Sequence, residues 1–176
     1  MPELIIPKSF QLEPFFKTED TITYDEDASF SFFLHQRQGL FLFDIMKASH
    51  IKSLQPWNER ERYVPKLFSD WTSTEEVIAI HFRNRDRVQA RDPMIKQLAH
   101  FIEAMFWMNK QPVHSLVTWR SELARLEIKP VNVVERLSFS IEQPDHYHSF
   151  IQLKALFVEI EKLFYKQLLL DRKKGM

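Results

Sequence analysis

The sequence predicts an all-α protein: an irregular multi-helix bundle in which a long C-terminal helix packs on a central apolar helix. Three observations predict this class. Only two of the 176 residues are glycine, which disfavours a fold built from many tight β-hairpins. Helix-start signals precede several apolar segments of the chain. Hydrophobic residues make up 44% and aromatic residues 14%, which is ample material for the core of one domain.

The N-terminal residues differ from the rest in charge and in proline content. Over residues 1–30 two lysines stand against seven acids, a net charge of −5, and Pro2, Pro7 and Pro14 interrupt the chain. We therefore predict an irregular, acidic, proline-containing arm at 1–27 and a single helical domain at 28–176. We expect the arm to dock, because it is too apolar for a solvated tail. The apolar residues are Leu4, Ile5, Ile6, Phe10, Leu12, Phe15 and Phe16.

Residues 28–53 carry two competing patterns. Helical spacing relates Phe30, Leu34, Phe41 and Ile45, whereas Phe30, Phe32 and Leu34 alternate as strand residues do. We favour a helix that is broken near Gly39, with Asp27 as its N-cap.

The middle of the chain offers two helix starts before the central helix. Pro65 suits the first turn of a short helix that runs to Trp71. Ser73 and Glu76 have the spacing of a capping box, so we expect a second helix from there towards Arg91.

The central helix is predicted over residues 93–109. Asp92 is its expected cap, and Pro93 suits the first helical position. Apolar residues cover so much of its circumference that it must be buried on most sides. One polar stripe remains, formed by Lys96, His100, Glu103 and Trp107.

Two short helices and one long helix complete the chain. Thr118 can cap a short helix that runs through Leu126, and Asn132 with Glu135 forms an Asn-type capping box for the next. From about residue 145 to 171 the apolar residues follow i, i+3, i+4, i+7 spacing. Phe150, Phe157 and Phe164 recur every seven residues on that face. We expect this helix to pack along the central one.

The half of the chain from Trp57 onward resembles the YpoC-like family of bacterial proteins. The segments that carry the resemblance are Leu67-Phe68-Ser69-Asp70-Trp71, residues 106–113 (FWMNKQPV), residues 129–137 (KPVNVVERL) and residues 147–163. The resemblance implies an α-helical domain of uncharacterised function. It supplies no catalytic residues to carry over to this chain.

Several classes of chemistry are disfavoured by what the sequence lacks. With no cysteine there is no disulfide, thiolate nucleophile or cysteine-based metal site. No glycine-rich phosphate loop, Gly-x-Ser-x-Gly elbow or His-Glu-x-x-His motif occurs. His100 and Glu103 share a helix face, but His146 and His148 would lie on different faces. We expect no cofactor and no metal, and these absences favour a binding protein over an enzyme.

The compartment follows from the N-terminus and from hydropathy. Residues 1–10 lack the basic region and the long apolar region of a signal peptide. No stretch reaches the roughly 18 apolar residues of a membrane span. We expect a cytoplasmic protein that does not bind membranes.

Our first functional hypothesis is a binding or regulatory protein whose partner is another protein or a second copy of itself. The candidate partner-binding residues are Trp107, Phe157 and Phe164. Exposed aromatic side chains often anchor interfaces. The alternative for each of them is a place in the core.

The second hypothesis is nucleic-acid binding through Arg83, Arg85, Arg87 and Arg91. Over residues 81–91 four arginines stand against one acid, a net charge of +3. On one continuous helix, Arg83, Arg87 and Arg91 would form a stripe suited to phosphates. The alternative is a solvated face whose arginines pair with acids such as Glu75, Glu76 or the N-terminal acidic run. The neutral net charge of the chain favours this alternative.

Overall fold

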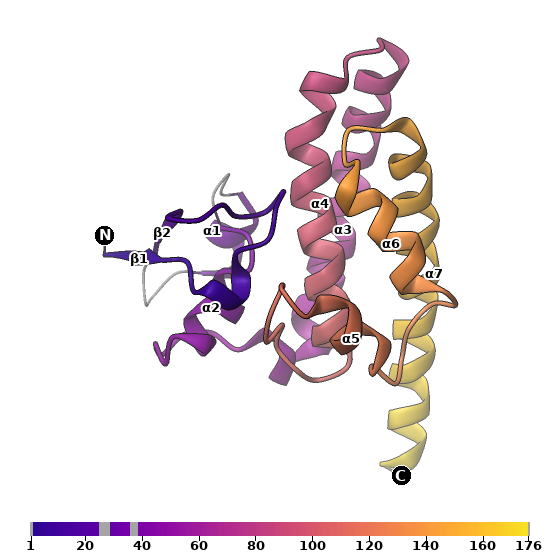
Figure 1. Ribbon diagram of the computed structural model, residues 1–176. Helices are drawn as coiled ribbons and strands as arrows, with labels where there is room; N and C mark the ends of the chain where they lie inside the picture. Colours follow the sequence, from indigo (N-terminus) through magenta and orange to yellow (C-terminus); the bar gives the residue numbers. More distant parts are fainter. Residues whose placement is uncertain (1, 25–28, 36–38, 176) are drawn as a thin grey trace.

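The computed structural model describes residues 2–24, 29–35 and 39–175, and it confirms the predicted all-α class (Figure 1). The helices are α1 (Phe30–His35), α2 (Leu42–Ala48), α3 (Arg60–Arg83), α4 (Arg87–Met108), α5 (Trp119–Ala124), α6 (Val133–Glu142) and α7 (Tyr147–Lys174). Two 3-10 turns, η1 (Lys8–Phe10) and η2 (Pro56–Asn58), and two strands, β1 (Glu3–Ile5) and β2 (Thr21–Thr23), complete the described elements. No helix among the described residues is long and apolar enough to cross a membrane.

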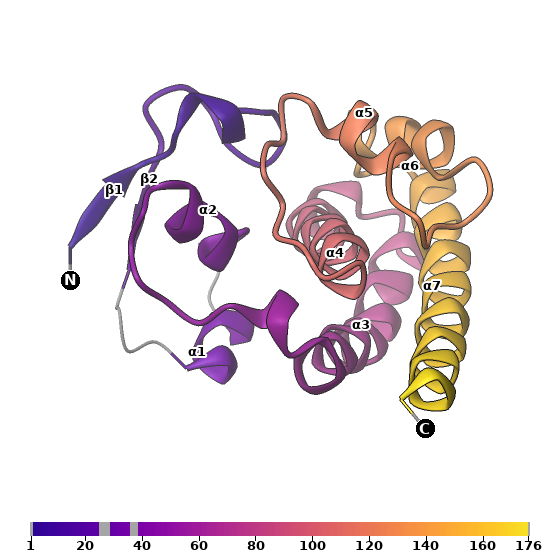
Figure 2. The same ribbon diagram turned by 90° about the horizontal axis from the view of Figure 1, so that it is seen from below.

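The central helix is α4, and it is more deeply enclosed than any other long element (Figure 2). Every residue from Gln97 to Met108 is buried, including the polar ones. The long helix α7 packs on it as predicted: the rings of Phe101 and Phe157 meet edge to face with their centroids 5.4 Å apart. Phe157 also stacks on Trp71 of α3 at 4.6 Å, so α7 is held by both helices of the α3–α4 hairpin.

The helix boundaries around residue 73 were predicted wrongly, because α3 is continuous through that point. The Ser73 hydroxyl donates to the carbonyl of Ser69, 3.1 Å away and one turn back, and caps nothing. Pro65 lies inside α3 and does not start it. The helix begins at Arg60, whose guanidinium donates to the carbonyl of Met108 at 2.8 Å and holds the first turn against the end of α4.

The start of α4 was also predicted wrongly. Its N-cap is Asp86, whose carboxylate accepts a bond from the amide of Gln89 at 3.2 Å, and Pro93 lies inside the helix. The turn before it needs Arg85 in the left-handed conformation, with φ at 54°. The central helix therefore begins at Arg87, upstream of the predicted start at residue 93.

The two short helices α5 and α6 begin at the predicted residues. Thr118 and Asn132 occupy the N-cap positions, but neither makes a side-chain capping bond. Asn132 has a φ of 56°, so its side chain does not point back at the first turn. The expected helix starts are confirmed, whereas the expected Asn132 capping box is absent.

The N-terminal residues form a layer on the side of α4 that faces away from α7 (Figure 2). Strands β1 and β2 pair antiparallel with Leu4 opposite Ile22. The helix favoured over residues 28–53 is present as α1 and α2, with Gly39 between them, while Asp27 lies outside the described residues. The ring of Phe41 meets those of Phe10, Phe15 and Phe16 at 5.3 to 6.4 Å. This apolar packing holds the residues before β2 against the start of α2.

Candidate functional site

The three aromatic residues proposed for partner binding all lie in the core. Trp107 and Phe164 have no exposed surface, and Phe157 retains 2%. Trp107 is covered by α1 and α2, with the rings of Phe30 and Phe33 at 6.0 and 6.3 Å. Side chains buried in this way cannot contact a partner, so we correct the assignment of these residues to an interface.

Asp44 is a functional candidate that the sequence reasoning missed. Its side chain lies fully inside the protein and one carboxylate oxygen accepts two bonds, from the Trp107 indole at 3.0 Å and from the amide of Val113 at 2.7 Å. The other oxygen has no partner among the described residues. The available signal was a single acid within the apolar run from Leu40 to Met46.

Burial controls the protonation of Asp44. Removal from water raises the pKa of this carboxyl to about 7 from its ordinary 3.8, and the bonds from Trp107 and Val113 only partly oppose the rise. Asp44 therefore gains and loses its proton near neutral pH.

His100 and Glu103 form a second group of buried polar side chains, on α4. The His100 Nδ1 lies 3.2 Å from the Glu103 carboxylate, as the shared helix face predicted. Burial, and then the neighbouring Asp44, hold the pKa of Glu103 well above its usual range. Burial lowers the pKa of His100 to about 4, although Asp70 raises it from 3.6 Å away. At neutral pH we therefore expect a protonated Glu103 and a neutral His100.

Asp44, Gln97, His100 and Glu103 are buried polar residues that, with the partly exposed Asp70, form a polar cluster that links helices. The Gln97 amide donates to Asp70 at 2.8 Å and so links α4 to α3. The described residues include no group of three or more His, Asp or Glu side chains that could hold a metal ion. His146 and His148 instead pack against the Phe139 ring at 5.8 and 5.5 Å.

The arginines at 83–91 do not form one helical stripe, which corrects the geometry assumed for a nucleic-acid patch. Arg83 ends α3, Arg85 lies in the turn, and α4 starts at Arg87. Arg83 pairs with Glu76, one of the predicted acids. Arg87 and Arg91 lie 3.4 and 4.0 Å from Asp145, an acid that was not predicted. Three of the four guanidinium groups thus already have a carboxylate nearby.

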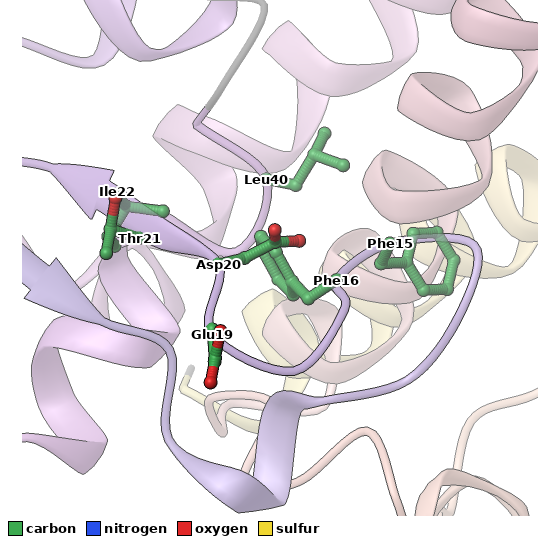
Figure 3. A pocket seen from close by; sticks show the side chains of 7 residues that line it. All are labelled: Phe15, Phe16, Glu19, Asp20, Thr21, Ile22 and Leu40. Carbon is green, nitrogen blue, oxygen red and sulfur yellow. The ribbon is translucent and has the colours of Figure 1, made fainter.

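A surface cavity of about 410 Å³ lies at the loop between η1 and β2 (Figure 3). Its lining combines Phe15, Phe16, Ile22 and Leu40 with Glu19, Asp20 and Thr21. The Asp20 carboxylate already accepts the amide of Lys17 at 2.7 Å. None of the lining residues forms an arrangement suited to catalysis or metal binding.

The most distinctive surface feature is a line of exposed apolar side chains on α7, which we call the α7 seam. It consists of Tyr147, Ile151, Val158, Tyr165 and Leu169, with exposed fractions from 42% at Ile151 to 59% at Tyr147. At 100° per residue these five positions fall within an arc of about 40°. The seam lies on the solvent side of α7, although the Tyr147 ring also meets Phe82 of α3 at 5.7 Å and the Tyr165 ring meets Phe68 at 6.4 Å. It is therefore a narrow apolar ridge on a helix whose inner face is already buried in the core.

Comparison with known proteins places the chain in a family. The family model for YpoC-like proteins matches residues 50–172, from just before η2 to near the end of α7. The chain belongs to the YpoC-like family. It is 32% identical over 117 residues to the uncharacterized protein YpoC of Bacillus subtilis (strain 168), a match that covers 66% of this chain and 71% of that protein. No solved structure matches it.

The YpoC-like region contains some of the candidate sites and omits others. The whole α7 seam, Trp107, His100 and Glu103 lie inside the matched residues, whereas Asp44 and the cavity of Figure 3 lie before them. The relative is described as uncharacterized, so family membership adds no activity.

Proposed function

We propose that this protein binds a partner protein through the α7 seam. The observation that carries the proposal is the ridge of five exposed apolar side chains on a helix whose other apolar face is already buried. Exposed apolar residues in isolation are ordinary, but here five share one line along a single helix, with the exposed charges of Lys154, Glu161 and Lys162 in the turns between them. The seam extends from Tyr147 to Leu169, about 33 Å at the rise of an α-helix.

The shape of the seam favours a helical partner. An apolar stripe one residue wide is the pattern of a helix-packing seam, whereas a helix that covers a globular core needs an arc of about 100° or more. Ile151, Val158 and Tyr165 recur every seven residues, as contact positions between two packed helices do. A second helix laid along α7 would bury these side chains with little change in either surface.

The arginine patch is a weaker candidate for a binding surface than the α7 seam. Its guanidinium groups at Arg83, Arg87 and Arg91 already face carboxylates of the same chain. Binding a phosphate there would first require these contacts to be broken, which lowers the gain from each new contact. Nucleic-acid binding through this patch thus stays the weaker alternative.

The test is affinity capture from the native cell with three forms of the protein. Val158→Glu places a charge in the middle of the seam, and Val131→Glu makes the same change at a valine that is 77% exposed elsewhere. We expect partners to be captured by the wild type and by Val131→Glu and lost with Val158→Glu. Equal capture by all three forms, each shown by circular dichroism to be folded, would contradict the proposal.

A further inference from the structure

The solvent face of α7 carries a strong excess of positive charge. Its exposed cations are Lys154, Lys162, Lys166, Arg172, Lys173 and Lys174, and Glu161 is the one exposed acid among its described residues. The remaining acids of the helix are paired with cations of the same chain. Glu159 holds Arg136 at 3.0 Å, and Asp171 pairs with Arg60 and with Lys110. The charge that reaches solvent around the seam is therefore basic.

Two of these cations flank the seam and form no ion pair with a carboxylate in the described part of the chain. Lys154 pairs with Glu75 of α3 at 3.1 Å, but Lys162 and Lys166 make no ion pair with any residue in the described part of the chain. By helix geometry Lys162 lies one turn after Val158 and Lys166 lies about one turn before Leu169, both on the side away from α3. A helix packed on the seam would bring its own flanking residues next to these ammonium groups.

The same charges argue against a second copy of this chain as the occupant. If two α7 seams packed on each other in antiparallel alignment, the flank of each copy that carries Lys162 and Lys166 would face the same flank of the other copy. Like charges placed opposite one another at a helix interface are destabilising. A helix with acidic flanks would meet no such repulsion.

A membrane surface fits the seam less well than a helix does. Interfacial helices bury a broad apolar face in the lipid boundary. The seam covers only about 40° of arc. Lys162 adjoins this narrow ridge, so a deeper insertion would take its charge into the apolar layer.

We infer that the partner is an amphipathic helix that packs its apolar residues on the α7 seam and places acidic side chains beside Lys162 and Lys166. The inference rests on the proposed function and adds the chemistry of the partner. The apolar ridge supplies the contact area, and the lysines select the charge of the segment that occupies it.

The experiment measures binding of two synthetic helical peptides to the full-length protein by fluorescence anisotropy. Both peptides carry the same leucine seam, one with glutamate and the other with lysine at the flanking positions. We expect the glutamate peptide to bind at least tenfold more tightly, and to lose much of that advantage in high salt. The double variant Lys162→Glu/Lys166→Glu should reverse the preference. The matched control Lys47→Glu/Lys52→Glu changes two exposed lysines outside α7 and should keep it.

Several results would overturn the inference. Equal binding of the two peptides, or an unchanged preference in the Lys162/Lys166 variant, would remove the role of these lysines. Seam-dependent binding to phosphatidylserine vesicles with neither peptide bound would assign the seam to a membrane surface. A dimer that Val158→Glu dissociates would assign it to a second copy. If the peptides fail while cellular capture still depends on Val158, the proposed function stands and only the acidic partner is wrong.

Discussion

At the scale of single residues, Asp44 is the clearest case of chemistry that depends on the fold. Its partners Trp107 and Val113 lie 63 and 69 residues away along the chain. Local spacing therefore had no means of finding the pair. The sequence did place His100, Glu103 and Trp107 on one polar stripe, and these residues do line one side of α4. The sequence pattern could not show that α1 and α2 cover this side of α4.

Asp44 is expected to make the stability of the protein depend on pH. A carboxyl whose folded pKa is raised to about 7 contributes stability that is fully present below about pH 4 and is lost as the pH rises to about 7. A pKa difference of one between the folded and unfolded states corresponds to about 1.4 kcal/mol, so the loss is at most about 4 kcal/mol. Asp44→Asn has no proton to lose and keeps an oxygen for Trp107 and Val113. We expect its stability relative to wild type to rise from pH 5 to pH 8 in urea unfolding.

Comparison of the two proteins at each pH is needed because His100 acts in the opposite direction. Its pKa is lowered to about 4, so it contributes stability that is lost as the pH falls from about 6.5. That contribution is common to both proteins and cancels in the difference. A difference between wild type and Asp44→Asn that stays constant over this range would show that Asp44 does not titrate as described.

At the scale of elements, local capping signals located some helices and misplaced others. The starts at Thr118 and Asn132 agree with the structure because each follows a proline-containing loop in which no helix can continue. The signal at Ser73 failed because the residues before it are also helical and bury Leu67, Phe68 and Trp71 against other helices. Burial of that face outweighs a cap worth about 1 kcal/mol.

Mutation can distinguish Asp86, the N-cap of α4, from Ser73, which the sequence predicted as a cap. Asp86→Ala removes the side chain that accepts from the amide of Gln89, so we expect it to destabilise the protein by about 1 kcal/mol. Ser73→Ala removes only a bond within α3 at an exposed position and should change stability by less than about 0.5 kcal/mol. Thermal or urea unfolding measures both. A larger loss for Ser73→Ala than for Asp86→Ala would favour a helix that starts at residue 73.

The two faces of α7 make a second contrast. Phe157 is buried between Trp71 and Phe101, so Phe157→Ala should cost about 3 to 5 kcal/mol through lost contacts and a cavity. Its neighbour Val158 lies in the exposed seam, and Val158→Ala should cost less than about 0.5 kcal/mol. The measurement is the free energy of unfolding in urea. Similar losses for the two variants would mean that the seam is packed against something within the protein.

At the scale of the whole molecule, the α3–α4 hairpin separates the N-terminal layer from α7 (Figure 2). The family match covers the hairpin and everything after it up to residue 172, and it leaves residues 1–49 outside. A partner on the α7 seam would therefore leave the N-terminal layer and Asp44 in place.

The long helix and its core face were predictable from periodicity alone. The seam was overlooked because five apolar residues on the polar face of an amphipathic helix give no signal until exposure is known.

The most direct test of partner binding is photo-cross-linking in the native cell. A photoreactive phenylalanine analogue replaces Tyr165 in the seam, and in a second form it replaces Val131, which is exposed away from α7. We expect a specific cross-linked protein at position 165 that is absent at position 131 and is lost when Val158→Glu is added. The same cross-links at both positions, or none at 165 from a folded and expressed protein, would contradict the seam as the binding surface.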